Sequence, residues 1–230
     1  MFPLELVESI PGWMLPGDAE KLYELALQTA GPVLEIGTYR GRSTVLMGLA
    51  GQASGRETLI YSIDVERPAL RAGRRAAEMH GVADRIVFVH GTLAGFARAY
   101  PHVRPALTFV DGDHSMEGAS RDIARLRGIV PRGGLILFHD YDDPLNDDPA
   151  CTSICVRPAG AASWVGEECG FLGVFGCCGL FVRRAGDAAS AVAAAEVMGL
   201  ESLGAQFTYR VRRPLAAFVH ATARRVRGRR

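Results

Sequence analysis

The stretch from Pro32 to Ser43 is Pro-Val-Leu-Glu-Ile-Gly-Thr-Tyr-Arg-Gly-Arg-Ser, an apolar run followed by a loop that contains two glycines. A short apolar run is typical of a buried strand, and the residues after the loop follow a helical pattern as far as Leu49. Gly37 and Gly41 allow the backbone to turn tightly and let a ligand approach the first turn of that helix. The stretch therefore predicts a strand, a loop and a helix in succession, which is the repeating unit of an α/β fold.

Four more apolar runs follow along the chain. They are Leu59–Asp64, Arg85–Val89, Ala106–Asp111 and Gly134–His139, with helical patterns between several of them. Strands that are apolar along most of their length and alternate with helices predict a parallel sheet that is covered by helices on both faces. Further on, the runs 171–175 and 179–183 flank Gly-Cys-Cys and predict an antiparallel hairpin.

Helices are also expected outside this alternation. Asp18 fits the N-cap of a helix that precedes the first strand. Cys151 and Cys155 are four residues apart, which favours one face of a helix rather than a zinc site built on loops. Residues 188–200 and 214–228 are predicted to be helical as well. We expect one domain over residues 1–184, including the N-terminal helix. Residues 185–230 are expected to be a C-terminal extension that belongs to the same domain or to an oligomer contact.

The composition limits the class of protein. The 230 residues are 48% hydrophobic and 22% charged, which excludes a disordered chain. A net charge of +1 conceals an asymmetry, because residues 210–230 hold eight arginines and no acid, while the rest of the chain carries a net charge of −7. Five cysteines, an odd number, favour reduced thiols and a cytoplasmic protein, and no apolar stretch is long enough to cross a membrane.

Acidic and polar side chains gather where the predicted strands end. Ligands of parallel sheets bind beyond these carboxyl ends, near the point at which the strand order reverses. The Gly-x-x-x-Gly spacing differs from the motif that binds a dinucleotide pyrophosphate, and no phosphate-loop lysine follows it. A ligand without phosphates fits better, with Glu35 available to an ammonium group and Asp64 to the two hydroxyls of a ribose. An acid at the position of Asp64 would serve NAD equally well.

Three motifs of this chain resemble those of a known family. Glu35-x-Gly37-x-x-x-Gly41, with Asp64 ending the second strand, resembles class I S-adenosylmethionine (SAM) methyltransferases. Two longer motifs are similar to those of O-methyltransferases that act on sugars and antibiotic scaffolds: Phe-Val-Asp-Gly-Asp-His-Ser-Met-Glu from 109 to 117, and Gly-Gly-Leu-Ile-Leu-Phe-His-Asp-Tyr from 133 to 141. The resemblance covers roughly residues 10–184. It implies a Rossmann-like, seven-stranded, mostly parallel sheet with a C-terminal antiparallel hairpin.

The resemblance also implies where SAM would bind. The methionine end would lie against Glu35, Gly37, Gly41 and Ser43. Asp64 would hold the ribose, Thr92 would lie near the adenine, and Asp111 would complete the cofactor-binding residues.

A divalent metal, Mg²⁺ or Mn²⁺, is implied in the same way. Relatives bind it through the first Asp after strand four and two acids after strand five, which correspond here to Asp111, His139 and Asp140. His139 departs from the two-acid pattern, and imidazole suits transition metals better than Mg²⁺. Alternatively, His139 lies behind the ligands, and Asp142 or water completes the site.

The chemistry of methyl transfer suggests the remaining roles. Transfer from a sulfonium ion to a hydroxyl depends on alignment of donor and acceptor and on removal of the hydroxyl proton. A neutral histidine suits that removal, so His114 is the first candidate for the base and Asp113 the second. A helix-start cap is the alternative role for His114.

The sequence thus predicts a SAM-dependent, metal-dependent O-methyltransferase that acts on a saccharide or glycosylated natural product. We expect a homodimer that binds neither nucleic acid nor membrane. Three alternatives stay open: a nicotinamide-dependent oxidoreductase on the same sheet, an RNA methyltransferase that uses the basic tail, and a SAM-binding regulator without activity. The arginine-rich tail would contact phosphates in the second of these.

Overall fold

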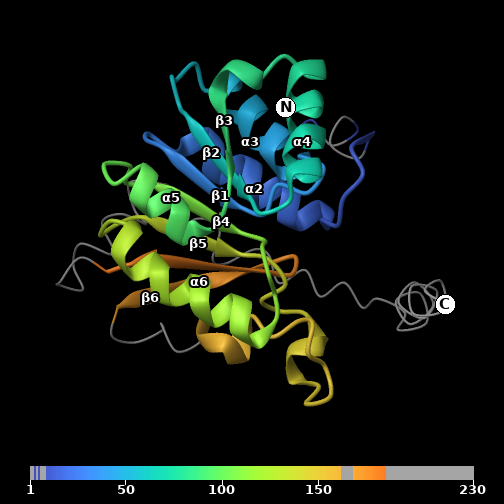
Figure 1. Cartoon of the computed structure of the whole chain (residues 1–230), viewed down its shortest axis with the longest axis vertical. Coiled ribbons are helices and arrows are strands. Elements are labelled where there is room, and N and C mark those ends of the chain that lie inside the picture. The colour runs from blue at the N-terminus through green and yellow to red at the C-terminus, as the bar shows by residue number, and fades with distance from the viewer. Residues whose placement is uncertain (1–2, 4, 6–8, 162–167, 185–230) are drawn as a thin grey trace.

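The computed structural model (Figure 1) describes residues 3, 5, 9–161 and 168–184. Its seven strands form one sheet in the order β3-β2-β1-β4-β5-β7-β6. Strands β1 to β5 run parallel, whereas β7 lies antiparallel to both β5 and β6. The strands are β1 Val33–Ile36, β2 Ile60–Asp64, β3 Ile86–His90, β4 Leu107–Val110, β5 Leu135–Phe138, β6 Cys169–Phe175 and β7 Cys178–Arg183.

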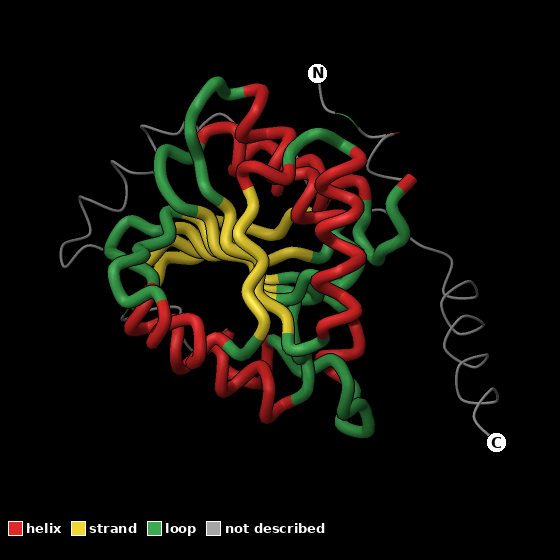
Figure 2. The backbone as a smooth tube through the Cα atoms, turned by 45° about the horizontal axis from the view of Figure 1, so that its top comes forward, coloured by secondary structure: helices red, strands yellow, loops and turns green. Residues whose placement is uncertain are grey.

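The helices lie on both faces of the sheet, as Figure 2 shows. Side chains alternate across each strand, so Val33 and Leu34 belong to two different apolar clusters. One cluster joins the sheet to α2, α3 and α4, and the other joins it to α5 and α6. The bounds are α2 Pro16–Gln28, α3 Arg42–Ala53, α4 Arg67–Met79, α5 Leu93–Ala99 and α6 Met116–Ile129, with short turns η1 Ala83–Arg85, η2 Pro144–Asp147 and η3 Arg157–Ala161.

This architecture confirms the predicted fold class. Each strand expected from an apolar run lies within two residues of its predicted bounds, and the hairpin turns at residues 176–177. The strand order reverses between β1 and β4, which places a crevice at their carboxyl ends. No helix within the described residues combines the length and the apolar character that crossing a bilayer requires.

Two local predictions are wrong. The N-cap of α2 is Leu15, because Pro16 has the fixed φ that favours the first helical position, and Asp18 lies two residues further into the helix. The Asp18 carboxylate nevertheless accepts a hydrogen bond from the Leu15 amide at 2.7 Å. Residues 151–156 form loop rather than helix, and the Cys155 thiol donates to the Cys151 carbonyl. The helices predicted at 188–200 and 214–228 lie outside the described residues.

Candidate functional site

Two acids and two histidines meet at the carboxyl ends of β4 and β5. Asp111 follows β4 directly and His114 lies three residues later, while His139 and Asp140 follow β5. We call these four side chains the acid–histidine cluster. Because β4 and β5 are parallel neighbours, their carboxyl ends lie side by side. All four residues are candidates from the sequence, Asp111, His139 and Asp140 as metal ligands and His114 as the base.

The nitrogen and oxygen atoms of the cluster are closely spaced. Nδ1 of His139 lies 3.2 Å from Oδ1 of Asp111 and 3.2 Å from Oδ1 of Asp140. His114 bridges the same two acids, with Nε2 at 3.3 Å from Asp111 and Nδ1 at 3.1 Å from Asp140. Each imidazole therefore faces two carboxylates at once.

Charge and burial set the protonation of the cluster. Burial by itself would lower the pKa of His114, but the carboxylates of Asp111 and Asp140 outweigh it and raise that pKa to about 9. The pKa of His139 is likewise raised by Asp111 despite burial. Burial opposes the ionisation of both acids, yet the histidines hold the pKa values of Asp111 and Asp140 below the usual range. Without a bound cation, the histidines are thus protonated near neutral pH.

The cluster fits a divalent cation in one specific respect. Nδ1 of His139 and Nε2 of His114 are buried and lack a hydrogen-bond partner, although carboxylate oxygens lie within 3.3 Å of each. Metal–ligand bonds of about 2.0–2.2 Å place neighbouring ligand atoms roughly 3.0–3.5 Å apart, as these atoms are. The ligand atoms of Asp111, His114 and His139 all lie within 4.8 Å of one another, and Asp140 is outside that group. Of the predicted ligands, Asp111 and His139 therefore have the spacing that a cation requires, and the ligand role of Asp140 stays a prediction.

Asp140 has an unusual backbone conformation. Its φ is +55°, in the left-handed region, which Asp and Asn adopt more readily than other non-glycine residues. The Asn146 side chain donates to the Asp140 carbonyl at 2.7 Å and holds this turn in place. The turn directs the carboxylate back toward both histidines, since its two oxygens face His139 and His114.

Glu35 lies deeper than the sequence suggests. Its carboxylate is fully buried and accepts hydrogen bonds of 2.5 Å from the hydroxyls of Ser43, Thr44 and Ser62. Burial raises its pKa to about 7, although the three hydroxyls oppose the shift. Glu35 thus fastens the first turn of α3 and strand β2 to β1. Contact of Glu35 and Ser43 with a ligand ammonium stays a prediction.

The two glycines of the first loop are needed for close backbone approach. Gly37 has φ +97°, and a Cβ there would lie 2.1 Å from the carbonyl oxygen of Asp111. Gly41 has φ +83°, and a Cβ there would lie 2.7 Å from the Cα of Gly73 in α4. Gly37 therefore lets the loop after β1 lie directly against the start of the acid–histidine cluster.

Asp64 and Thr92 occupy the expected strand ends. Asp64 accepts hydrogen bonds from the amides of Thr38 and Tyr39 at 2.9 and 3.1 Å, and thereby shapes the loop after β1. Its Oδ1 also accepts from the Glu66 amide at 2.8 Å, so the partly exposed carboxylate keeps one lone pair on Oδ1 for a ribose hydroxyl. Thr92 is the N-cap of α5, with its hydroxyl accepting from the Gly95 amide. The ribose and adenine roles stay predictions.

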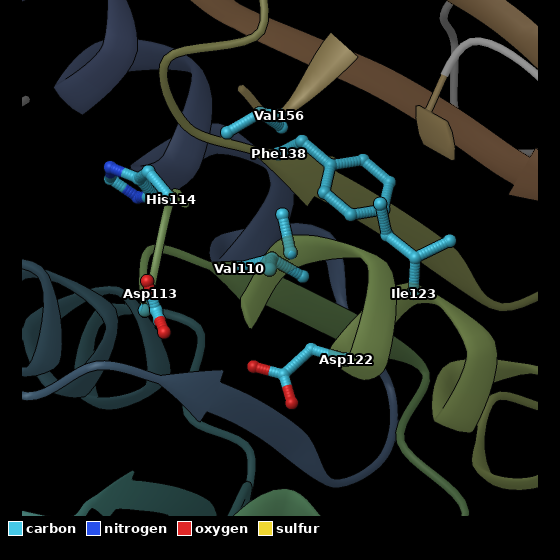
Figure 3. Close-up of a pocket in the computed structure, with 9 residues that line it drawn as sticks. Val110, Asp113, His114, Asp122, Ile123, Phe138 and Val156 are labelled. Atoms are coloured by element: carbon cyan, nitrogen blue, oxygen red, sulfur yellow. The ribbon is translucent and has the colours of Figure 1, made fainter. Parts of the chain in front are cut away.

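A small pocket opens beside the cluster. In Figure 3, His114 and Asp113 lie on one side of it and Phe138 and Ile123 on the other. Asp113 accepts from the Ser115 amide and faces Arg121 at 3.5 Å, and a hydrogen bond with Ser115 lowers its pKa. Asp113 therefore serves the turn before α6. The pocket is lined by Val110, Gly112, Asp113, His114, Ala119, Asp122, Ile123, Phe138 and Val156.

The sequence analysis missed two residues of this region, Asp18 and Cys177. The Asp18 carboxylate is fully buried and accepts from the Cys177 amide at 2.7 Å. The Cys177 thiol lies 3.6 Å from Oδ1 of Asp140 and 3.7 Å from Nε2 of His139. A helix-start acid and a turn cysteine that lie 159 positions apart carry no pattern that links them.

Comparison with known proteins is consistent with this geometry. Residues 34–141 match the family model described as a methyltransferase domain. A curated relative, a probable cobalt-precorrin-6B C(15)-methyltransferase (decarboxylating) of Pyrobaculum calidifontis, is 31% identical over 87 residues, which are 38% of this chain. The match spans 43% of that relative, less than half of its length.

Solved structures share the fold at low sequence identity. An O-methyltransferase of Bacillus cereus in complex with SAH is 14% identical with a TM-score of 0.61, covering 79% of this chain and 88% of that one. A TDP-rhamnose 3′-O-methyltransferase of calicheamicin biosynthesis is 18% identical with a TM-score of 0.56, covering 74% of this chain and 77% of that one. Residues 34–141, just under half of this chain, are thus similar to a methyltransferase domain, and the sheet order agrees with that fold.

Proposed function

We propose that the protein transfers a methyl group from SAM to a hydroxyl of a saccharide or glycosylated natural product, with the help of a divalent cation. The observation that carries the proposal is the acid–histidine cluster, four ionisable side chains at the ends of β4 and β5, beside the point where the strand order reverses. In sheets of this kind, ligands bind at such a reversal.

SAM fits the crevice through side chains of the first two strand ends. Asp64 is partly exposed and would accept from the ribose hydroxyls, while the loop from Gly37 to Gly41 would border the methionine end. The O-methyltransferase of Bacillus cereus, which has the same fold, is in complex with SAH. The saccharide acceptor is supported by the motifs around Asp111 and His139 and by the likeness to a TDP-rhamnose methyltransferase.

Asp111, His139 and Asp140 would hold the cation. Bound there, it would lower the pKa of an acceptor hydroxyl in contact with it. His114 lies beside the same two acids and would accept the hydroxyl proton once those carboxylates are engaged by the cation. Glu35 would keep the loop after β1 in place, so that donor and acceptor are aligned for in-line transfer.

The proposal is tested by a SAM-consumption screen against sugars and glycosides, with and without Mg²⁺ or Mn²⁺. We expect turnover of at least one glycoside in the presence of metal and its loss in EDTA. Calorimetry should detect binding of SAM and not of NAD. Binding of NAD in place of SAM would overturn the methyl-transfer proposal, and turnover that is indifferent to EDTA would remove the metal from it.

Two variants separate the roles within the cluster. His114→Ala should abolish turnover while SAM still binds, because the imidazole lies outside the predicted SAM-binding residues. Asp111→Asn should lower the affinity for the cation, since it removes a charged ligand. If His114→Ala retains near-full activity, His114 is not the base.

A further inference from the structure

A second group of metal-ligating side chains lies behind His139, on the side of the ring away from Asp111. Nε2 of His139 faces the carboxylate of Asp18 from helix α2 and the thiol of Cys177 from the turn between β6 and β7. The three distances are 3.6 Å from Nε2 to Oδ2 of Asp18, 3.7 Å from Nε2 to the Cys177 sulfur, and 3.4 Å from that sulfur to Oδ2.

This triangle has the size of one face of a zinc site. Bonds of about 2.3 Å to sulfur and about 2.0–2.2 Å to nitrogen and oxygen place the ligand atoms of a tetrahedral ion roughly 3.3–3.6 Å apart. A direct hydrogen bond between the imidazole and the carboxylate would require a shorter contact than 3.6 Å. The spacing therefore suits a shared ion better than direct pairing.

The burial of the donors strengthens this interpretation. Asp18 is fully buried, and among the described residues its only ion-pair partner is His139. Its oxygens also accept hydrogen bonds from the amides of Leu15 and Cys177, which fix the carboxylate beside the imidazole and the thiol. Cys178 is also fully buried, and its sulfur lies within 4.8 Å of the ligand atoms of Asp18, His139 and Cys177. Two thiols, an imidazole and a carboxylate form a donor set that selects zinc and similar ions over Mg²⁺.

We propose that Asp18, His139 and Cys177, with Cys178 as a fourth ligand, bind a thiophilic divalent ion such as Zn²⁺. The Cys177 and Cys178 thiols would each release a proton to solvent when their sulfurs bind the ion. A neutral imidazole has one lone pair, so His139 serves either this site through Nε2 or the acid–histidine cluster through Nδ1. Given the proposed function, an ion at this second site inhibits methyl transfer by withdrawing His139 from the first.

Cobalt provides a direct test, because a thiolate bound to Co²⁺ gives a near-ultraviolet charge-transfer band that oxygen and nitrogen ligands do not give. Co²⁺ is added to the metal-free full chain under reducing conditions, and we expect the band to appear and to be displaced by Zn²⁺. Cys177→Ser should lower the band by about half, because the Cys178 thiolate remains, and should weaken Zn²⁺ binding by about tenfold or more. Cys177→Ser combined with Cys178→Ser should lose the band. Cys155→Ser removes a buried thiol outside the group and should keep the band.

The acid–histidine cluster supplies the second control. Asp111→Asn removes a charge from the first site, lies outside the second group and should keep the cobalt band, with circular dichroism confirming that the variant is folded. A band that is absent from the wild-type chain, that is undiminished in Cys177→Ser, or that disappears in Asp111→Asn would overturn the second site. The measurement needs neither SAM nor acceptor, so its failure would leave the methyl-transfer proposal standing.

Discussion

Among single residues, Glu35 combines full burial with three hydroxyl donors, and this determines how it responds to pH. Its pKa is raised from 4.5 to about 7 in the folded chain, so the folded state binds a proton more tightly than the unfolded state. The stability that this proton contributes is fully present below pH 4.5. It is lost as the pH rises through 7, and the shift corresponds to about 3 kcal/mol.

Glu35→Gln should therefore be nearly neutral for stability at pH 4.5 and stabilising by up to about 3 kcal/mol at pH 8, because glutamine imitates the protonated acid. Urea unfolding of both chains at a series of pH values, without ligand, measures the difference. A constant difference between the two chains across that range would show that Glu35 does not titrate with the folded state.

Gly37 is the residue at which the cluster and the first loop are closest. Gly37→Ala would add strain of about 1–2 kcal/mol from its positive φ. Overlap with the Asp111 carbonyl should add about 1–3 kcal/mol. Gly55→Ala is the matched control, since Gly55 also has a positive φ, +68°, but a Cβ there meets no atom within 4 Å. Thermal unfolding should show a clearly larger loss for Gly37→Ala, and equal losses would mean that the close approach to Asp111 is absent.

Among the secondary-structure elements, α6 begins directly after His114 and depends on one cap. The Ser115 hydroxyl accepts from the Gly118 amide at 3.1 Å. Ser115→Ala should lower the free energy of unfolding by about 1 kcal/mol, whereas Ser115→Asp should keep the cap and most of the stability. Chemical denaturation compares the two variants, and indifference to both would remove the capping role.

The strands were predictable because each is a mostly apolar run, which is typical of a parallel sheet buried on both faces. The acid–histidine cluster was predictable for a related reason, since parallel neighbours bring the residues after β4 and β5 together whatever the side chains are. Asp64 ends β2 as the same rule predicts, whereas Glu35 lies within β1 and is buried more deeply than the sequence suggests. Their hydroxyl and amide partners were not predicted, because these contacts depend on the path of the loop and on the side-chain conformations.

The contact between Asp18 and Cys177 could not be predicted from the sequence. Asp18 fits a helix start, and the local pattern accounts for it completely without reference to β7. Its actual partner is the turn between β6 and β7. A Cβ at Gly176 would lie 2.0 Å from Oδ1 of Asp18, so any side chain at position 176 would prevent this contact. Tertiary contacts of this kind have no periodicity, and the structure alone brings the two residues together.

For the whole molecule, the acidic residues of the site and the arginine-rich C-terminal residues occupy different parts of the sequence, which predicts the effect of removing the latter. The described fold is complete at Arg184, and the arginine-rich residues 213–230 lie beyond it. A chain that ends at residue 212 should keep SAM binding and small-molecule turnover, since the acids of the site all lie before residue 184. Loss of activity in this truncated chain would instead favour the RNA methyltransferase.

A longer deletion from the C-terminus should have the opposite effect. A chain that ends before Cys169 lacks β6 and β7. Strand β7 pairs with β5 through Phe181 and neighbouring apolar residues, and β6 pairs with β7. It should unfold or aggregate, as near-ultraviolet circular dichroism and gel filtration would show. The homodimer and the cytoplasmic location expected from the sequence stay predictions.

The contact between Asp18 and Cys177 also has a consequence for synthesis of the chain. When a ribosome has synthesised residues 1–140, both histidines and both acids of the cluster are present in the nascent chain. The hairpin that covers Asp18 is still untranslated at that stage. Until then Asp18 lacks the Cys177 amide and thiol, its partners on that hairpin. The nascent polypeptide therefore acquires the complete site only when the last two strands emerge.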